Sequence, residues 1–365
     1  MPELPEVERA AALIREHAVG KLIHHVDTFD DSLVFSGFTH LEFAHEITGR
    51  VVEDAARYGN NLASPQYNVI RFSFHHSGKC FYIQLQGSGR TPVLHFGMTG
   101  ALQVRGHVTV KYKSTASSAS DMWPPRFVKF ILYIQDGNSA PGFTEIAFSD
   151  ARRLGRIRLV GSPLDEPPIS ELGFDPVLSM PSLEDFHASL SKRTCPIKAL
   201  LLDQAFSAGV GNYLADEILY QARVHPEQRC STLDRDQVIA LHHHVADVCR
   251  VAVQANADDS KYPEHWLFKH RWGKGKNAKT VMKLPSGEPA TIKWITVGGR
   301  TSAYVAEVQK LSSSRGNVLN STAASDVAVV QDGVAQRRSQ RRQHAYDDGV
   351  EPSRTGRPKR RRTVK

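Results

Sequence analysis

Cysteine is scarce in this chain of 365 residues, which contains four: Cys80, Cys195, Cys230 and Cys249. None of them forms a Cys-x-x-Cys pair, which argues against a disulfide framework and against a cysteine-ligated zinc site. We therefore expect reduced thiols in an intracellular protein.

Long apolar runs are also missing. The sequence has no stretch of about 18 uninterrupted apolar residues, so it predicts no membrane span. It does not begin with a charged segment followed by an apolar one, so we expect no secretory signal. The length favours two domains.

An excess of positive charge is absent from most of the chain. Residues 312–365 hold 12 Lys and Arg against 5 Asp and Glu, whereas the first 311 residues hold 34 against 33. The formal net charge of +8 therefore says little about the folded part, and a nucleic-acid role must be argued from local sites. We expect the aperiodic tail to be disordered. Its clusters at 337–342 and 357–362 suit a nuclear-import signal, which predicts a nuclear location, a nonspecific nucleic-acid tail or merely a solvated tail.

Periodicity divides the rest into two parts. Val7, Ala11, Ile14 and Ala18 form one apolar stripe and predict a helix over 5–18. Segments rich in β-branched and aromatic residues predict strands at 21–27, 42–54, 80–86, 92–96, 127–135 and 145–148. Beyond about residue 163, helical patterns at 182–190, 197–206, 213–222 and 233–255 precede short β segments at 280–283, 291–295 and 302–305. The sequence thus predicts an α+β fold, with an antiparallel β domain before a helical one.

The first six residues, Met-Pro-Glu-Leu-Pro-Glu, carry unusual chemistry. Removal of Met1 would give Pro2 a free secondary amine, which titrates near pH 8 and is partly nucleophilic at neutral pH. Such an amine can form an iminium with an aldehyde-like carbon, and Glu3 is placed to move protons. By themselves, however, these residues favour an ordinary solvated terminus that leads into a helix.

Several later motifs each allow two interpretations. The segment Gly209-Val210-Gly211-Asn212 between two predicted helices, the first of which carries Lys198, could bind a DNA phosphate through bare backbone N–H groups or could be a plain glycine-capped loop. Arg300, at a glycine-made hairpin tip, could grip a phosphate or be an exposed turn residue.

Two further loops could fill the gap that a flipped base leaves in a duplex. The segment Asp150-Ala151-Arg152-Arg153-Leu154-Gly155 follows a strand, and Met98 lies between glycines at a strand end. Alone, the first is better explained as a surface turn and the second as core filler. Neighbouring residues of a helix point about 100° apart, so His242, His243 and His244 cannot share one metal. We interpret them as surface and packing residues.

The order of these motifs is more informative than any one of them. Met-Pro-Glu-Leu-Pro-Glu, His-Phe-Gly-Met, Asp-Ala-Arg-Arg-Leu-Gly, Gly-Val-Gly-Asn and Gly-Gly-Arg-Thr begin at residues 1, 95, 150, 209 and 298. Over residues 1 to about 311 the chain resembles the formamidopyrimidine-DNA glycosylase family, and residues 208–228 resemble its plant and fungal branch.

The resemblance implies roles at matching positions. Pro2 would be the Schiff-base nucleophile at the sugar C1′, with Glu3 protonating the opening sugar and Glu6 lining the same site. Met98, Arg152 and Leu154 would stand in the void left by the flipped base. Contacts with the DNA phosphates would come from Lys198, Asn212 and Arg300, and Arg300 would also donate a proton in the second elimination.

The chain departs from the family pattern at the finger near the C-terminus. The usual zinc finger has four cysteines, whereas residues 250–311 contain none. The resemblance therefore implies the zincless finger of plant and fungal members: the same hairpin with Arg300, held by apolar residues such as Trp294, Ile295, Tyr304 and Val305.

A second departure concerns the lysine that contacts the lesion strand in the family. Asn60 follows Arg57-Tyr58-Gly59, where the lysine is expected, whereas Lys79 precedes a good strand and lies 19 residues before Met98, close to the family spacing. Lys79 is thus the better candidate, and residues 60–78 would be an insertion.

We hypothesise that this insertion is a translated intron, and a genuine loop is the alternative. Sequencing of the transcript distinguishes the two, because messages that mostly retain codons 60–78 would rule out the intron.

The resemblance implies three segments: a catalytic β-sandwich domain with an N-terminal helix (1–163), a helix–two-turn–helix domain with a zincless finger (164–311) and the basic tail (312–365). It implies a monomeric, bifunctional glycosylase and abasic-site lyase that acts on oxidised purines in double-stranded DNA without a membrane, metal or cofactor. The alternatives are a catalytically impaired DNA-damage-binding protein of this fold and a structural nucleic-acid-binding protein.

Overall fold

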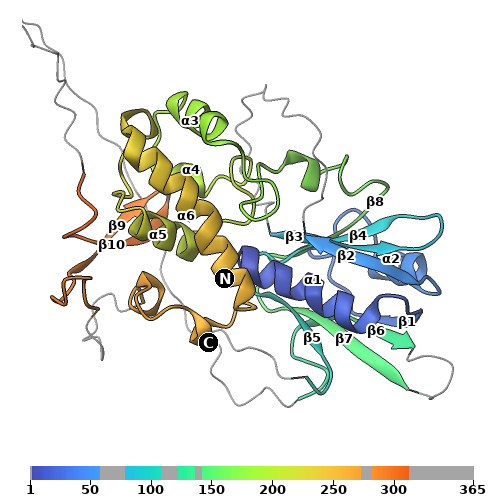
Figure 1. Ribbon diagram of the computed structural model, residues 1–365. Coiled ribbons are helices and arrows are strands. Elements are labelled where there is room, and N and C mark those ends of the chain that lie inside the picture. The colour runs from blue at the N-terminus through green and yellow to red at the C-terminus, as the bar shows by residue number, and fades with distance from the viewer. Residues whose placement is uncertain (1, 58–78, 108–121, 136–141, 273–281, 312–365) are drawn as a thin grey trace, which may run out of the picture. The chain divides into compact units, whose positions relative to one another are not determined.

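The computed structural model describes residues 2–57, 79–107, 122–135, 142–272 and 282–311 (Figure 1). The predicted insertion at 60–78 and the predicted tail at 312–365 lie outside the described residues. No helix in the described part of the chain is long and apolar enough to span a bilayer.

The first half contains two antiparallel four-stranded sheets and two helices. One sheet has the order β1 (Ile23–Thr28), β6 (Val128–Gln135), β7 (Phe143–Asp150), β5 (Gly100–Val104), and the other β2 (Val52–Arg57), β3 (Cys80–Leu85), β4 (Thr91–His95), β8 (Arg156–Val160). The helices are α1 (Leu4–Ala18) and α2 (His40–Ile47).

Apolar side chains from both sheets and from α1 form the first core. The predicted α1 stripe is confirmed, because Val7, Ala11, Ile14 and Ala18 are all fully buried. Phenylalanines link the two sheets through the core: the rings of Phe130 and Phe148 lie 5.6 Å apart, and those of Phe148 and Phe96 lie 5.8 Å apart. Burial of such large rings is a main source of stability in a sandwich.

The second half is helical and ends in a hairpin. It contains α3 (Leu183–Ser191), α4 (Ile197–Leu201), α5 (Asn212–Gln221) and α6 (Arg235–Gln254), with four short 3₁₀ turns at Ile169–Glu171, Cys230–Thr232, Asp259–Lys261 and Leu267–Lys269. Strands β9 (Ile292–Val297) and β10 (Arg300–Val305) pair antiparallel. The predicted apolar repeat of α6 lies in the second core, so this prediction is confirmed.

The predicted fold class is thus confirmed: an N-terminal helix with antiparallel sheets is followed by a helical region with a hairpin. Residues 1–314 form one compact unit that contains two main cores. The boundary between residues 163 and 164 stays a prediction, and so does the statement that the hairpin needs no zinc.

Three local predictions were wrong. The strand expected at 42–54 is α2 followed by β2, because Thr39 accepts a hydrogen bond from the backbone N–H of Glu42 (3.1 Å) and the Glu42 carboxylate accepts one from that of Thr39 (2.6 Å). Such a reciprocal capping box starts a helix. Strands β5 and β8 were missed. The helix expected at 197–206 ends at Leu201, because Gln204 bonds to Val210 and Gly209 and holds the chain in a turn.

Buried ions connect the two halves. Arg57, at the end of β2, is 5% exposed and bonds to Glu8 of α1 at 2.9 Å and to the fully buried Asp175 beyond β8. Figure 1 shows α1 running beside β2, and the C-terminal end of α6 lies next to the N-terminal end of α1. Because an unpaired buried charge is costly, Arg57 holds β2, α1 and the segment around Asp175 together.

Glu217, in the middle of α5, is a buried acid in the helical half. Its carboxyl group accepts hydrogen bonds from the backbone N–H groups of Phe268 (2.8 Å) and Leu267 (3.3 Å) and from the Gln221 amide (2.8 Å). Burial nevertheless raises its pKa to about 7. The glutamate thus anchors the segment before the hairpin.

This raised pKa predicts a pH-dependent stability. Between about pH 4.5 and pH 7 the folded protein binds a proton at Glu217 that the unfolded chain releases, so the group's contribution to stability is lost as the pH rises through this window. We expect the unfolding free energy of the parent relative to Glu217→Gln to fall by about 3 kcal/mol from pH 4.5 to 7. Urea titrations at a series of pH values measure this difference, and a constant difference would contradict the prediction.

Candidate active site

The Glu3 carboxylate is held at the N-terminus of α5. It is 1% exposed. Its Oε2 accepts hydrogen bonds from the backbone N–H groups of Gly211 (3.0 Å) and Leu214 (3.1 Å), and its Oε1 accepts one from that of Tyr213 (3.0 Å). The first N–H groups of a helix have no partners within the helix and attract an anion. Here the anion belongs to the chain itself.

The two glycines before α5 make room for the N-terminal segment. The backbone N–H of Leu4 donates to the carbonyl of Gly209 at 2.9 Å. A Cβ on Gly211 would lie 2.3 Å from Cδ of Glu3, and one on Gly209, whose φ is +80°, would lie 2.8 Å from Cβ of Leu4. The predicted phosphate site of bare N–H groups is therefore wrong for Gly211, Tyr213 and Leu214, because Glu3 already accepts the hydrogen bonds of their N–H groups.

Glu6 completes the polar contacts around the N-terminus. Its Oε2 accepts a hydrogen bond from the backbone N–H of Glu3 at 2.7 Å, and its Oε1 accepts one from the Tyr213 hydroxyl at 3.0 Å. Pro2 is buried directly before Glu3. Glu3 is held through both its backbone N–H and its carboxylate. The backbone that carries the ring of Pro2 is therefore held as well.

Lys79 lies at the same place, although it is 77 residues from Pro2 in sequence. It is 5% exposed, and burial lowers the pKa of its ammonium group; Glu3 and Glu6 oppose this effect, and the nearby Arg300 adds to it. The structure therefore brings Glu3, Glu6 and Arg300 into electrostatic range of Lys79. A lowered pKa increases the neutral, proton-accepting fraction of the amine.

The hairpin tip that carries Arg300 rests on α4. A Cβ on Gly298, whose φ is +58°, would lie 3.2 Å from Ala199. The Asn212 amide donates to the carbonyl of Thr301 at 3.0 Å, while its Oδ1 is buried without a hydrogen-bond partner. Asn212 and Arg300, both predicted to hold phosphates, thus lie on adjacent elements.

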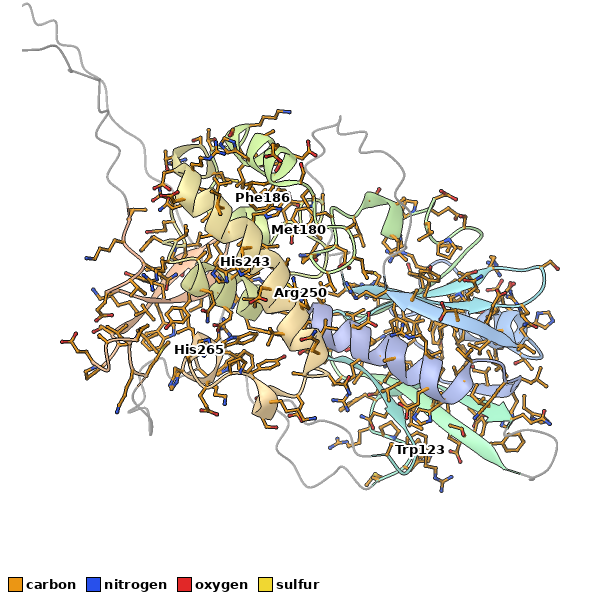
Figure 2. All side chains as sticks on the ribbon, viewed as in Figure 1. Trp123, Met180, Phe186, His243, Arg250 and His265 are labelled. Atoms are coloured by element: carbon orange, nitrogen blue, oxygen red, sulfur yellow. The ribbon has the colours of Figure 1, made fainter. Side chains whose placement is uncertain are left out.

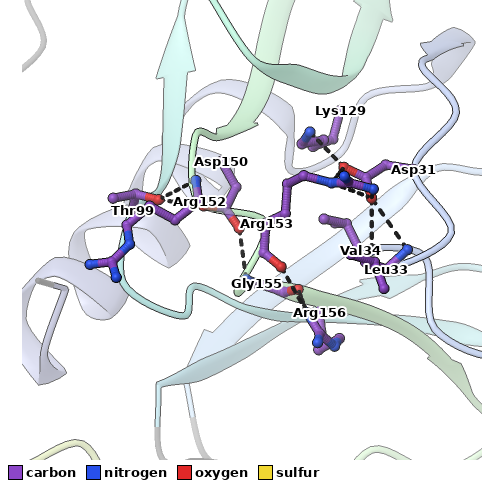
Figure 3. A network of polar contacts seen from close by, with 10 residues as sticks. All are labelled: Asp31, Leu33, Val34, Thr99, Lys129, Asp150, Arg152, Arg153, Gly155 and Arg156. Carbon is purple, nitrogen blue, oxygen red and sulfur yellow. Dashed lines mark hydrogen bonds and ion pairs between the residues drawn. The ribbon is translucent and has the colours of Figure 1, made fainter. Parts of the chain in front are cut away.

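The paired arginines after β7 have different roles (Figure 3). Arg153, with φ 55°, is exposed but turns toward Asp31 and donates to both of its carboxylate oxygens at 2.9 and 3.1 Å, and Lys129 bonds the same carboxylate at 2.7 Å. Burial would raise the pKa of Asp31, but these two cations lower it to about 2. Arg152 points the other way and is exposed.

The two loops predicted to fill a void lie in contact. A Cβ on Gly97 would lie 2.4 Å from the backbone of Leu154. The Thr99 hydroxyl accepts a hydrogen bond from the backbone N–H of Arg152 at 3.0 Å. Met98, between these two residues, therefore lies next to the loop of Arg152 and Leu154. Leu154 is 41% exposed, so its side chain is accessible to a ligand.

The prediction that Lys198 contacts DNA was wrong for this structure. Its side chain is fully buried and forms an ion pair with Asp216 on α5. Asp216 also accepts hydrogen bonds from Arg271 (2.5 Å) and from the backbone N–H of Ala303 on β10 (3.1 Å). Lys198 thus helps to fix the hairpin against α4 and α5 and does not present its amine to a ligand.

Polar contacts therefore supplement the predicted apolar ones in holding the hairpin. Trp294 donates to the carbonyl of Arg271 at 3.1 Å, and both Trp294 and Val305 pack in a small core with Leu267 and Ala303. Tyr304 instead packs edge-on against His225. Sequence reasoning missed Asp216 and Arg271. The only available signal for Asp216 was its position four residues after Asn212, on the same side of α5.

Within the described residues, His243, His244 and Asp247 of α6 form the group whose ligand atoms could hold a metal, since these atoms lie within 4.8 Å of one another. His242 is excluded, as it bonds to the carbonyl of Pro181 at 2.8 Å. The prediction that His242, His243 and His244 do not share one metal is consistent with this group, and their interpretation as surface and packing residues stays a prediction. Asp247 already bonds to Arg250, and Figure 2 shows His243 and Arg250 on α6.

Comparison with known proteins shows the class and then the family. The formamidopyrimidine-DNA glycosylase N-terminal domain matches residues 1–157, and the formamidopyrimidine-DNA glycosylase H2TH domain matches residues 172–263. These matches, which cover more than half of the chain, define a DNA glycosylase of base excision repair. The chain belongs to the formamidopyrimidine-DNA glycosylase family.

Relatives support the same assignment. A formamidopyrimidine-DNA glycosylase of Arabidopsis thaliana is 39% identical over 311 residues, which is 85% of this chain and 71% of the relative. That of Desulforamulus reducens is 29% identical over 85% of this chain and 99% of its own. A Lactococcus lactis enzyme, solved as the G226P mutant with DNA containing Fapy-dG, shares the fold at a TM-score of 0.62 and 21% identity, with 85% of this chain and all of the other covered.

The close approach of Gly211 to Glu3 predicts a strong effect of one methyl group. Since φ at Gly211 suits alanine, the Gly211→Ala variant suffers only from its contact with Glu3. A displacement of about 1 Å near a reacting group costs about 100-fold in rate, so we expect a loss of that size in glycosylase activity on damaged DNA. Gly161→Ala is the control, because φ at Gly161 is not in the left-handed region and an added Cβ would meet only the flexible end of the Glu166 side chain, at 3.0 Å. Equal activities of the two variants would refute the role of the glycine.

Proposed function

We propose that the protein is a bifunctional DNA glycosylase and abasic-site lyase whose nucleophile is the amine of Pro2. The observation that carries this proposal is the placement of Glu3. Its carboxylate lies directly after Pro2, fixed by three backbone N–H groups, and Lys79 is in electrostatic range of both Glu3 and Arg300. A nucleophile next to acid–base groups, in a buried polar site, is what imine formation requires.

The proposed reaction begins when the Pro2 nitrogen attacks the sugar C1′. The bond from C1′ to the base breaks, and the base leaves with a proton from water. The Glu3 carboxylate takes the proton of the Pro2 nitrogen and passes it to the ring oxygen as the ring opens. The resulting iminium draws electrons from C2′, which loses a proton as the 3′ phosphate leaves. A second elimination, with Arg300 as proton donor, expels the 5′ phosphate and leaves a gap in the strand.

We propose damaged double-stranded DNA as the partner and oxidised purines as the substrates: formamidopyrimidines, 8-oxoguanine or its further oxidation products. Support comes from solved relatives, whose complexes hold Fapy-dG, carbocyclic 8-oxo-G or abasic-site DNA. Within this chain, the exposed Arg152 and Leu154 next to Met98 suit insertion into a duplex from which a base has been flipped. The cation at Arg300 and the amide of Asn212 suit the flanking phosphates.

Borohydride trapping on an oligonucleotide with an abasic site tests the proposal. We expect the mature protein to form a covalent adduct with the DNA, because borohydride reduces the imine. Pro2→Gly keeps an N-terminal amine but lacks the secondary one, so its adduct should be strongly reduced. A protein that retains Met1 has an amide at Pro2 and should form none.

Binding to the same DNA, measured by gel shift, is the control for folding. A mature protein that binds abasic-site DNA and yet yields no adduct would contradict the lyase proposal and would support a DNA-damage-binding protein of the same fold. An adduct that persists with Met1 in place would instead point to another amine, such as the α-amine of Met1 itself or the buried Lys79.

A further inference from the structure

Tyr213 contacts both carboxylates that follow Pro2. Its backbone N–H donates to Oε1 of Glu3 at 3.0 Å, and its hydroxyl donates to Oε1 of Glu6 at 3.0 Å, with Oε2 of Glu6 at 3.3 Å. The side chain is 2% exposed. One residue at the start of α5 therefore positions both Glu3 and Glu6, through two different groups.

A second buried tyrosine lies behind the first. Tyr262, beyond α6, is 3% exposed, and its hydroxyl is hydrogen-bonded to that of Tyr213. Burial, with the nearby Glu6 carboxylate, raises the pKa of Tyr262. Tyr262 thus keeps its proton. Because the single hydroxyl hydrogen of Tyr213 goes to Glu6, Tyr262 must be the donor between the two tyrosines.

Aromatic packing fixes the two rings. The ring of Phe268 lies 5.0 Å from that of Tyr213 and 5.1 Å from that of Tyr262, both edge-on, and the ring of Trp266 lies 5.0 Å from Tyr262. The backbone N–H of Phe268 is in turn bonded to Glu217 at 2.8 Å. These contacts leave the hydroxyl groups little freedom, so their direction is set before any ligand binds.

The far end of this chain of hydrogen bonds is the peptide group between Pro2 and Glu3. Oε2 of Glu6 accepts from the N–H of that peptide at 2.7 Å. A peptide group is planar, so the direction of its N–H also fixes its carbonyl and the Cα of Pro2. Tyr262, which lies 260 residues from Pro2 in sequence, thereby helps to restrict the orientation of the proline ring nitrogen.

We propose that Tyr262 and Tyr213 form a hydrogen-bond relay through Glu6 that positions the N-terminal proline, so that both tyrosines are positioning residues of the reaction. This inference rests on the proposed function of Pro2. The relay makes the reactive end of the chain rigid without any contact between the tyrosines and the substrate.

Groups other than Tyr213 also act on Glu6, and they are unchanged when Tyr213 is replaced. Lys79 and Arg9 lie within electrostatic range of Glu6, and Arg9 also interacts electrostatically with Asp258. The backbone N–H of Glu3 donates to Glu6, and Tyr262 lies within electrostatic range of Glu6. The Tyr213→Phe change leaves all of these groups in place, so a difference between this variant and the parent reports the lost Tyr213 hydroxyl.

The first measurement is the titration of the Glu6 carboxyl carbon by ¹³C NMR. A donated hydrogen bond favours the carboxylate, so Glu6 should titrate at a higher pH in Tyr213→Phe than in the parent. Tyr220→Phe is the matched control, because Tyr220 is a buried tyrosine of α5 that packs in the small core of the hairpin. An unchanged Glu6 titration in Tyr213→Phe would overturn the relay.

The second measurement is the rate of the borohydride-trapped adduct at saturating DNA. We expect a 10- to 100-fold loss in Tyr213→Phe, as for other groups that orient a reacting one, a smaller loss in Tyr262→Phe, and unchanged DNA affinity in both. The double variant should lose no more than Tyr213→Phe, because the two groups act in series. The acid limb of the pH–rate profile should move to higher pH with Tyr213→Phe and not with Tyr220→Phe.

The outcomes separate this inference from the proposed function. If the parent traps no DNA but Glu6 still titrates at a higher pH in Tyr213→Phe, the lyase proposal fails and the hydrogen bond stands. If the parent traps DNA and Tyr213→Phe does so at the parental rate and pH dependence, the positioning role is overturned.

Discussion

The rest of the site depends on the bond between the Glu3 carboxylate and the N-terminus of α5. A helix N-terminus offers unpaired N–H groups and partial positive charge, and the chain uses them to hold its own first acidic residue. The neighbouring residues show how firm this anchor is: Leu4 lies in the helical core, while Val7 lies in the core of the sandwich. The first turn of α1 therefore joins the two halves of the structure.

Periodicity was sufficient to predict most of the fold. The stripes of α1 and α6 repeat at three and four residues and are buried as expected, because burial of one face is what makes such a helix stable. It failed where a local polar contact outweighed the pattern. The aromatic and β-branched segment after Thr39 forms α2, since the capping box of Thr39 and Glu42 decides how it starts. Gln204 ends α4 early in a comparable way.

Motifs predicted which residues gather at the site but not how they are used. The two glycines before Asn212 suggested a place for an external anion, and only the structure shows that Glu3 occupies it from 208 residues away. Neither the burial of Lys198 against Asp216 nor the ion pair between Arg153 and Asp31 follows from spacing. Such partners are far apart in sequence, and no periodic pattern carries information about which distant charge will pair with which.

The distance in sequence between Glu3 and its three partners has a consequence for biosynthesis. A ribosome makes the N-terminal segment first and the residues from Gly211 to Leu214 some two hundred codons later. Until then Glu3 has no helix to bind, although the strands of the first half can already pair. The emerging protein therefore passes through a long interval in which its terminus is accessible to processing enzymes, and translation beyond α5 closes that interval.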